Sequence, residues 1–288
     1  MDLGIVLSDD LSRRAGGMNL PADPTTTTSQ AHGASPGGIV EPVWEQLEKS
    51  LIELVYGSNL IESAGSSFEV TSQLCQEVFR GNPVDCDTRS RKEVVFHARA
   101  LNFMIDQVVL NNHSWSEDLI LDCHRILYTG LDEDVMPGKY RDYAVAVRYG
   151  QPGGKQKQSI CMHASAVPTY MNNMVRHLNE ELSKAQKTGE IDPYTVAARY
   201  HHQFIMIHPF GDGNGRVSRI ILNVLLLKYA HRIALFGRHD EEKEKYLAVV
   251  RKCRKIFDQE DNEVDFAKQT SHQELAGFVL EKSGRPLL

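Results

Sequence analysis

Several kinds of protein are excluded by what the 288-residue sequence lacks. No apolar run approaches the roughly 18 residues that a membrane-spanning helix needs, so no membrane span is expected. The N-terminus has no basic leader followed by a long apolar core, which argues against a signal peptide. The formal net charge is −6, whereas general nucleic-acid or anionic-membrane binders are basic. We therefore expect neither nucleic acid nor a membrane as a partner.

Cysteine is scarce, and its five copies are scattered along the chain at positions 75, 86, 123, 161 and 253. An odd number without close pairs fits neither a disulfide framework nor a zinc ribbon. We therefore expect reduced thiols and a cytoplasmic or nuclear location.

Large apolar side chains are rare over residues 1–41, where Pro, Thr, Ser, Ala and Gly predominate. Such a segment cannot bury enough surface to offset the entropy of ordering, so we predict a disordered tail. The rest divides into an N-terminal helical region (42–115), a central domain (116–260) and a C-terminal helical extension (261–288).

Helical periodicity dominates the remaining sequence and predicts an all-α fold. A first helix is expected to end at Gly57, with SNLIES (58–63) as a separate turn or short helix. Further helices are predicted over 92–110, 116–127, 167–183, 193–207 and 214–230, with one or two peripheral helices after residue 239. Alternating residues on either side of QPGGK predict a single β-hairpin at 143–162.

The stretch from Ile207 to Arg219, IHPFGDGNGRVSR, contains the residues best suited to chemistry. Its three glycines let a ligand approach the main chain, and it leads into the start of a helix. Free N–H groups and the positive dipole end make such a start an anion site, most often for phosphate. Arg216 and Arg219 add two guanidinium groups, which bind phosphate oxygens.

Two other residues of this stretch extend the interpretation to Mg²⁺-nucleotide chemistry. Asp212 would repel a phosphate unless a cation lay between them, and Mg²⁺ is usually held by one carboxylate and phosphate oxygens. His208 has a side chain suited to a general base. A Gly-rich loop alone is usually only a turn, and this one lacks GxxxxGK[ST]. His201 and His202 point to different helical faces, so zinc is not expected.

HPFGDGNGR resembles the signature of Fic (Fido-domain) proteins, which reads HPF, any residue, Asp or Glu, then GNGR. The likeness continues in AARYHHQFIMI, PGKYR (137–141) and EKYLAVVRKC, over roughly residues 92–260. It implies a Fic/Fido helical bundle with 116–260 as the catalytic domain. It also implies transfer of AMP from ATP, with Mg²⁺, to a Ser, Thr or Tyr hydroxyl of a target protein.

The resemblance assigns roles to individual residues of this chain. His208 would be the catalytic base, Asp212 the Mg²⁺ ligand, and Tyr246 either an adenine contact or an ordinary core tyrosine. The 143–162 hairpin would be a flap that docks the target by adding strand hydrogen bonds. The residues implied in nucleotide and phosphate binding are Gly213, Asn214, Gly215, Arg216 and Arg219.

Ser58–Glu62 (SNLIE) resembles the inhibitory motif of the family, Ser or Thr, three residues, Glu, then Gly or Asn; here Ser63 replaces the last. Ser58 and Glu62 lie one helical turn apart, so both can face the active site. A buried Glu62 paired with Arg219 would occupy the arginine that the γ-phosphate needs, and such a pair would persist until displaced. The alternative is an exposed glutamate on a connector.

Other functions stay open beside an autoinhibited adenylyltransferase. Relatives that transfer phosphate commonly have Lys where this chain has Gly215, which disfavours that reaction; phosphocholine transfer also remains. The chain could instead remove AMP, with Glu62 aligning water, or act as a non-catalytic nucleotide-binding module. The family's Gly-Tyr-Pro-Pro is absent after the motif helix, where KYAHRIALFG stands. Assembly into a homodimer is left open.

Overall fold

The computed structural model describes residues 40–149, 157–260, 269–284 and 286–287. The predicted disordered tail (1–41), apart from its last two positions, lies outside the described residues, and so does the predicted hairpin turn.

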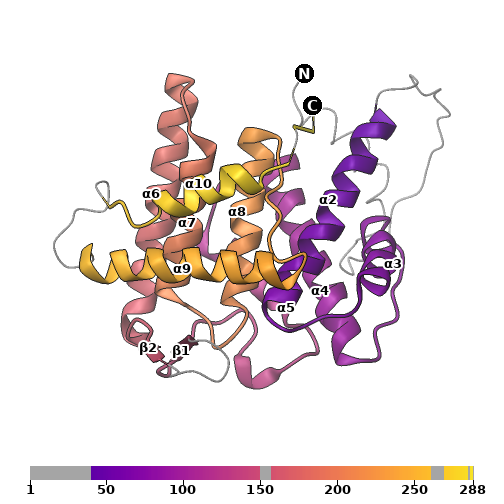
Figure 1. The fold of residues 1–288 in the computed structure, drawn as a ribbon, viewed down its shortest axis with the longest axis horizontal. Helices are drawn as coiled ribbons and strands as arrows, with labels where there is room; N and C mark the ends of the chain where they lie inside the picture. The colour runs from indigo at the N-terminus through magenta and orange to yellow at the C-terminus, as the bar shows by residue number, and fades with distance from the viewer. Residues whose placement is uncertain (1–39, 150–156, 261–268, 285, 288) are drawn as a thin grey trace, which may run out of the picture.

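The fold is an all-α bundle with one β-hairpin, as predicted (Figure 1). Short 3-10 turns lie at Glu133–Val135 and Ala164–Ala166. The hairpin consists of β1 (Ala146–Tyr149) and β2 (Lys157–Ile160). The helices are α2 (Val40–Ile61), α3 (Phe68–Phe79), α4 (Arg89–Met104), α5 (Glu117–Leu127), α6 (Val167–Thr188), α7 (Pro193–Ile207), α8 (Asn214–Ala230), α9 (Asp240–Glu260) and α10 (Gln273–Lys282).

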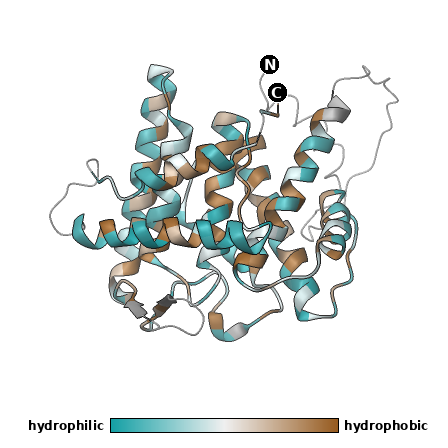
Figure 2. Ribbon diagram, in the orientation of Figure 1, coloured by the Kyte–Doolittle hydropathy of each residue, from teal (hydrophilic) through white to brown (hydrophobic). Residues whose placement is uncertain are grey.

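Helix α8 forms the centre of the molecule. Every residue from Arg216 to Leu227 is buried, which is the pattern of a helix surrounded by other elements. It contacts α2, α4, α5 and α7, and Figure 1 shows α9 crossing in front of α7 and α8. In Figure 2 the hydrophobic segments concentrate on these central helices, whereas α9 is largely hydrophilic on the side that faces the viewer. The loop that begins α8 is therefore held by the best-packed part of the core.

The predicted end of the first helix at Gly57 is wrong. Helix α2 continues through this glycine to Ile61, so Ser58 lies in its last turns and no separate element follows. A Cβ atom at position 57 would collide with the backbone carbonyl of Phe236. The glycine is needed because two backbones meet there, and it does not end the helix.

Two further elements differ from the sequence prediction. The helix predicted over 92–110 starts earlier, at Arg89, and its last turns are a π-helix, Ile105–Leu110. Helix α3 was not predicted, although its signal is present. Ser67 caps it through a hydrogen bond from the Val70 N–H, and its apolar residues are buried.

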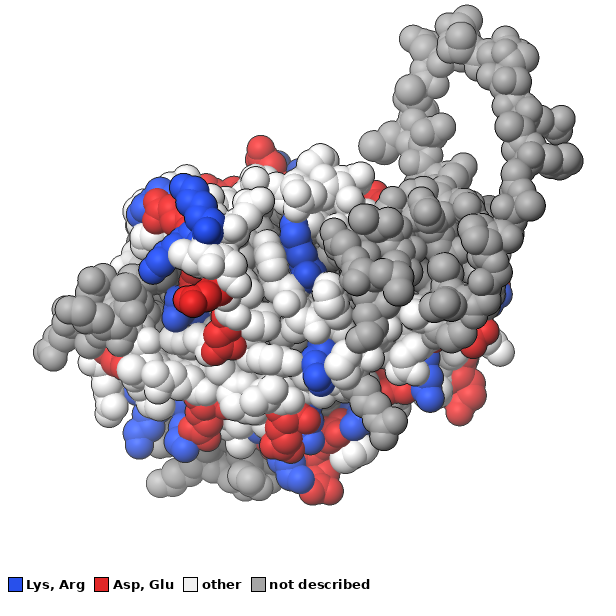
Figure 3. All heavy atoms as spheres, turned by 90° about the horizontal axis from the view of Figure 1, so that it is seen from above, with Lys and Arg blue, Asp and Glu red and all other residues white. Residues whose placement is uncertain are grey.

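The hairpin is antiparallel, with Ala146 opposite Ile160. A hydrogen bond from the Cys161 N–H to the Val145 carbonyl, 2.9 Å long, extends the pairing beyond the two strands. Figure 1 places the hairpin beside the lower ends of α6 and α7. No helix in the described part of the chain is long and apolar enough to cross a membrane. On the face shown in Figure 3, acidic and basic side chains are interspersed.

Candidate active site

The loop between α7 and α8 is fixed by its own side chains. His208 ends α7 in the left-handed conformation, with φ of 51°. The Asn214 side chain closes the loop, because it accepts a hydrogen bond from the Phe210 N–H and donates one to the Phe210 carbonyl, each 2.9 Å long. The Phe210 ring is fully buried and stacks on His124 at 3.7 Å. Asn214 thus shapes the predicted phosphate cradle from within.

Two glycines at the start of α8 are closely approached by other side chains. Gly213 has φ of 79°, and a Cβ there would meet the Tyr128 ring at 2.5 Å. A Cβ at Gly215, in the first turn of α8, would collide with Oε1 of Glu62. The Glu62 carboxylate therefore lies at the N-terminal end of α8, where helix geometry favours an anion.

Arg216 is buried, with 4% of its surface exposed, and its guanidinium is only partly satisfied. Nη2 donates to the Tyr128 hydroxyl at 2.8 Å, and the guanidinium lies 5.2 Å from the Tyr128 ring centroid. Nε and Nη1 have no hydrogen-bond partner among the described residues. Buried donors normally have partners, and these two fit the oxygens of an anion such as a phosphate.

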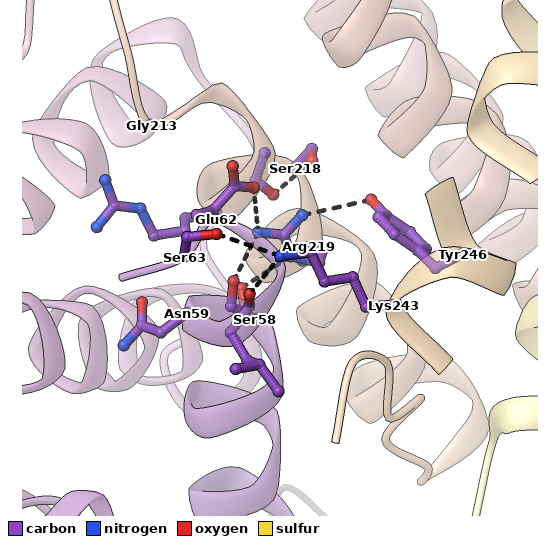
Figure 4. A network of polar contacts seen from close by, with 12 residues as sticks. Ser58, Asn59, Glu62, Ser63, Gly213, Ser218, Arg219, Lys243 and Tyr246 are labelled. Carbon is purple, nitrogen blue, oxygen red and sulfur yellow. Dashed lines mark hydrogen bonds and ion pairs between the residues drawn. The ribbon is translucent and has the colours of Figure 1, made fainter. Parts of the chain in front are cut away.

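Arg219 is 1% exposed and is bound by the end of α2 (Figure 4). Its Nε donates to Oγ of Ser58 at 2.8 Å, and Nη2 donates to the Ser58 carbonyl at 3.0 Å. Nη2 also donates to Oε1 of Glu62 at 2.6 Å, so the predicted ion pair is present. The expectation from the sequence that Glu62 is buried is wrong. Its side chain is 35% exposed, because it lies just beyond the last residue of α2.

Tyr246 lies beneath Arg219 and is 2% exposed. Its hydroxyl lies 2.9 Å from Nε2 of His201 and accepts a 3.5 Å hydrogen bond from Arg219, while its ring stacks on Phe236. Burial lowers the pKa of Arg219, but Glu62 and Tyr246 outweigh it, and the net pKa is raised. The adenine contact stays a prediction, and the burial of Tyr246 favours a core role.

His208 has the protonation state that a general base needs. Burial lowers the pKa of His208 to about 4, and the positive charges of Arg141 and Arg254 act in the same direction. The imidazole is therefore neutral at pH 7 and able to accept a proton. Its Nδ1 atom is enclosed and has no hydrogen-bond partner in the described part of the chain.

Asp212 lies in the loop with its carboxylate beside the start of α8. Oδ1 accepts a hydrogen bond from the Gly213 N–H at 2.7 Å, and the Asp212 carbonyl accepts one from Nε2 of His124 at 3.1 Å. Within the described residues, no group of three His, Cys, Asp or Glu side chains could hold a metal ion. A single carboxylate fits Mg²⁺ when phosphate and water oxygens supply the other ligands.

Sequence reasoning missed Arg141, which ties the hairpin to the loop. It is 2% exposed and donates to the His208 carbonyl at 2.7 Å, the Tyr143 carbonyl at 2.9 Å and the Met162 carbonyl at 2.6 Å. Its position at the end of PGKYR, just before the predicted hairpin, was the available signal. Nothing in that signal shows three carbonyls converging, because two of them, from Met162 and His208, come from distant parts of the chain.

The sequence model of the Fic/DOC family matches residues 114–226, which include the whole loop and most of α8. The matched segment covers fewer than half of the 288 residues and is similar to Fic/DOC proteins. Among curated proteins, the protein adenylyltransferase fic-1 of Caenorhabditis briggsae is 31% identical over 141 residues, 49% of this chain and 25% of the relative. The protein adenylyltransferase Fic of Nematostella vectensis is 24% identical over 190 residues, 65% of this chain and 40% of the relative.

Solved structures of Fic proteins have the same fold. A Fic-domain signaling protein from Bacteroides thetaiotaomicron is 24% identical with a TM-score of 0.67, and the match covers 84% of each chain. A Fic-1 fragment from Caenorhabditis elegans is 18% identical with a TM-score of 0.61, covering 97% of this chain and 68% of that one. The chain spans only a quarter to two fifths of the length of the curated relatives described above.

Proposed function

We propose that this protein is a Mg²⁺-dependent protein adenylyltransferase that is inhibited by its own Glu62. The observation that carries the proposal is the carboxylate at the start of α8. Glu62 lies against Gly215 and binds Arg219, where an incoming phosphate would bind. The partly unsatisfied Arg216 nearby gives the site a second phosphate-binding group. The Fic/DOC relatives named as adenylyltransferases support the reaction class.

The residues of the loop suit each part of such a transfer. The oxygen of a Ser, Thr or Tyr hydroxyl on the target attacks the α-phosphorus of ATP. The bond between this phosphorus and the oxygen that bridges it to the β-phosphate breaks, and pyrophosphate leaves. Neutral His208 takes the hydroxyl proton. Arg216, Arg219 and the N–H groups of α8 stabilise charge on the phosphates. Mg²⁺ bound to Asp212 and phosphate oxygens would neutralise further charge.

The inhibitory role of Glu62 follows from the competition for Arg219. A γ-phosphate cannot bind this guanidinium while Glu62 holds it at 2.6 Å. Ser58 adds two further contacts, so the arginine is held by the end of α2 in this state. Loss of Glu62 removes the competing carboxylate and leaves the Ser58 contacts that hold Arg219 in place, and the 35% exposure of the glutamate side chain means that little of the core is disturbed.

The test is to incubate Glu62→Gly protein with Mg²⁺, ATP and lysate proteins and to search for AMP adducts by mass spectrometry. We expect adducts on the protein itself or on a target, and far fewer with the wild-type chain. Glu62→Gly/His208→Ala is the matched control and should produce none. If the Glu62→Gly protein forms no adduct, or forms as many as the double variant, the proposal is wrong.

Removal of AMP is a second candidate, favoured by one observation. Glu62 binds Arg219 through Oε1 while its side chain stays partly exposed, so the carboxylate could also orient a water molecule. Wild-type protein would then release AMP from a target modified beforehand by Glu62→Gly protein, and Glu62→Gln would not.

A further inference from the structure

A cavity of about 290 Å³ lies beside the candidate active site, at the base of the hairpin. Its wall is formed mainly by apolar side chains of α6, α7, α9 and the segment between β2 and α6. These include Met174 from α6, Met206 and Ile207 from α7, Phe257 from α9, and Met162. The volume is at the small end for ligand pockets and suits one large side chain better than a whole cofactor.

The cavity is connected to the loop that contains His208 through the adjacent residue Ile207 and through hydrogen bonds of Arg141. Ile207 directly precedes His208, and Met162 lies two residues beyond the end of β2. Arg141 donates to the carbonyls of both Met162 and His208, at 2.6 Å and 2.7 Å. A group bound in the cavity is therefore held at a fixed place relative to the proposed base.

One polar atom in the cavity wall has no partner. Gln203 is 7% exposed, and its Oε1 accepts no hydrogen bond from the described residues. A buried acceptor without a donor is costly, so an occupant with an O–H or N–H group would satisfy it. The three methionines have flexible side chains that adapt to the shape of an apolar occupant.

Exposed apolar side chains gather near the cavity. Among the described residues, two of the five large exposed hydrophobic side chains belong to the hairpin and its start, Ile160 (79% exposed) and Tyr143 (42% exposed), and a third, Tyr170 (42% exposed), lies in the first turn of α6. Tyr170 also lines the cavity. Clustered exposed apolar side chains mark interaction surfaces, which points to a polypeptide as the occupant.

We propose that this cavity is a specificity pocket for the target protein, holding a tyrosine or tryptophan side chain that lies close in sequence to the modified hydroxyl. The inference rests on the proposed transfer to a protein. The aromatic ring fills the space between the methionines and Phe257, and its O–H or N–H donates to Oε1 of Gln203. A phenylalanine fits the same space but leaves Gln203 unsatisfied.

Methionine methyl groups allow a direct test that needs no catalysis. The full chain, labelled with ¹³C at its eight methionine methyls, is titrated by NMR with N-acetyl-tyrosinamide and N-acetyl-phenylalaninamide. The signals of Met162, Met174 and Met206 should move and saturate, whereas Met104, fully buried in the core, should not respond. The tyrosine amide should bind on the order of five-fold more tightly, as expected for one hydrogen bond. Gln203→Leu should abolish this difference.

Several results would contradict the proposal that this cavity is a specificity pocket. These are no movement of the three signals, equal movement of all methionines, or equal affinity for the two amides. If the three methionine signals moved with protein concentration alone, a second copy of the chain would fill the cavity. That result would also contradict the proposed pocket for a target side chain. Because the titration requires no ATP, it can fail while AMP transfer is confirmed, and it can succeed while transfer fails.

A transfer assay then tests whether the pocket selects substrates. Glu62→Gly protein is given peptides with one threonine and a tryptophan moved through the flanking alanines. Transfer should favour one tryptophan position, and Glu62→Gly/Gln203→Leu should lose that preference while still modifying the other peptides. Equal transfer at all positions would rule out a role of the cavity in target selection.

Discussion

At the scale of single residues, the site contains two arginines in opposite states. Arg219 is held by Ser58, Glu62 and Tyr246, whereas Arg216 donates to Tyr128 and leaves two donors without a partner among the described residues. The difference arises because the end of α2 reaches one guanidinium and not the other. Arg216 is thus the arginine that we propose binds a phosphate while Glu62 still holds Arg219.

Arg216→Lys should weaken ATP binding even though the charge is kept. Lysine cannot bind Tyr128 and a phosphate with a planar fork, and a hydrogen bond to a charged group contributes about 1.5–3 kcal/mol. We expect ATP affinity in the Glu62→Gly background to fall roughly ten- to hundred-fold by calorimetry. Tyr128→Phe, which removes only the hydroxyl, should cause a smaller loss. Unchanged affinity in Arg216→Lys would contradict a phosphate-binding role.

At the scale of elements, α9 contacts the end of α2 through hydrogen bonds on the outer side of the core. Nζ of Lys243 donates to the Leu60 carbonyl at 3.0 Å and to Oγ of Ser63 at 3.3 Å (Figure 4). On the inner side, Asn59 bonds to His97 of α4 at 2.9 Å, and the Gly65 N–H donates to Glu93 at 2.8 Å. The segment around Glu62 is therefore fixed by two helices in addition to Arg219.

Lys243→Met should raise the basal AMP transfer of the otherwise wild-type chain. The substitution removes two contacts that hold the residues around Glu62, and partly exposed contacts of this kind are worth about 0.2–1 kcal/mol. We expect an increase of roughly two- to five-fold, well below that of Glu62→Gly. Lys245→Met on the same helix is the control, because Lys245 pairs only with Glu241. Equal rates in the two lysine variants would refute this role of Lys243.

At the scale of the whole molecule, buried histidines link folding to pH. Burial is the largest cause of a lowered pKa in six of them. The pKa falls to about 4 for His124, His208 and His272 and to about 3 for His202, and it lies well below the ordinary value for His97 and His201. In the unfolded chain each binds a proton near pH 6.5. Between these values the unfolded state binds more protons, so lower pH favours unfolding.

These histidines should therefore leave the melting temperature nearly unchanged above pH 7. Below about pH 6.5 they should make it fall steadily toward pH 4. Calorimetry at several pH values, in buffers of different ionisation enthalpy, measures both the fall and the proton uptake on unfolding. His272→Gln should make the fall shallower. A melting temperature that stays level from pH 7 to pH 5 would show that these histidines are protonated in the folded state.

The helical architecture and the composition of the loop were readable from the sequence, because both depend on local patterns. The predicted starts of two helices depend on Ser116 and Pro193, and the structure confirms both starts. The 3.6-residue period predicted their buried faces. Gly57 misled the prediction because its role is a close approach to Phe236, which only packing creates. The π-helix at Ile105–Leu110 likewise leaves no trace in the apolar spacing.

The sequence by itself determined which groups the site contains: a histidine, an aspartate, a helix start rich in glycine, and two arginines. Tertiary structure alone decided their state. It brought Glu62 and Ser58 onto Arg219 across about 160 residues of chain. It also left Arg216 with two donors that have no partner in the described part of the chain, and it placed Arg141 where it joins the hairpin to the loop. Periodicity specifies which side chains share a face of one helix, whereas the contacts between helices depend on how the whole core packs.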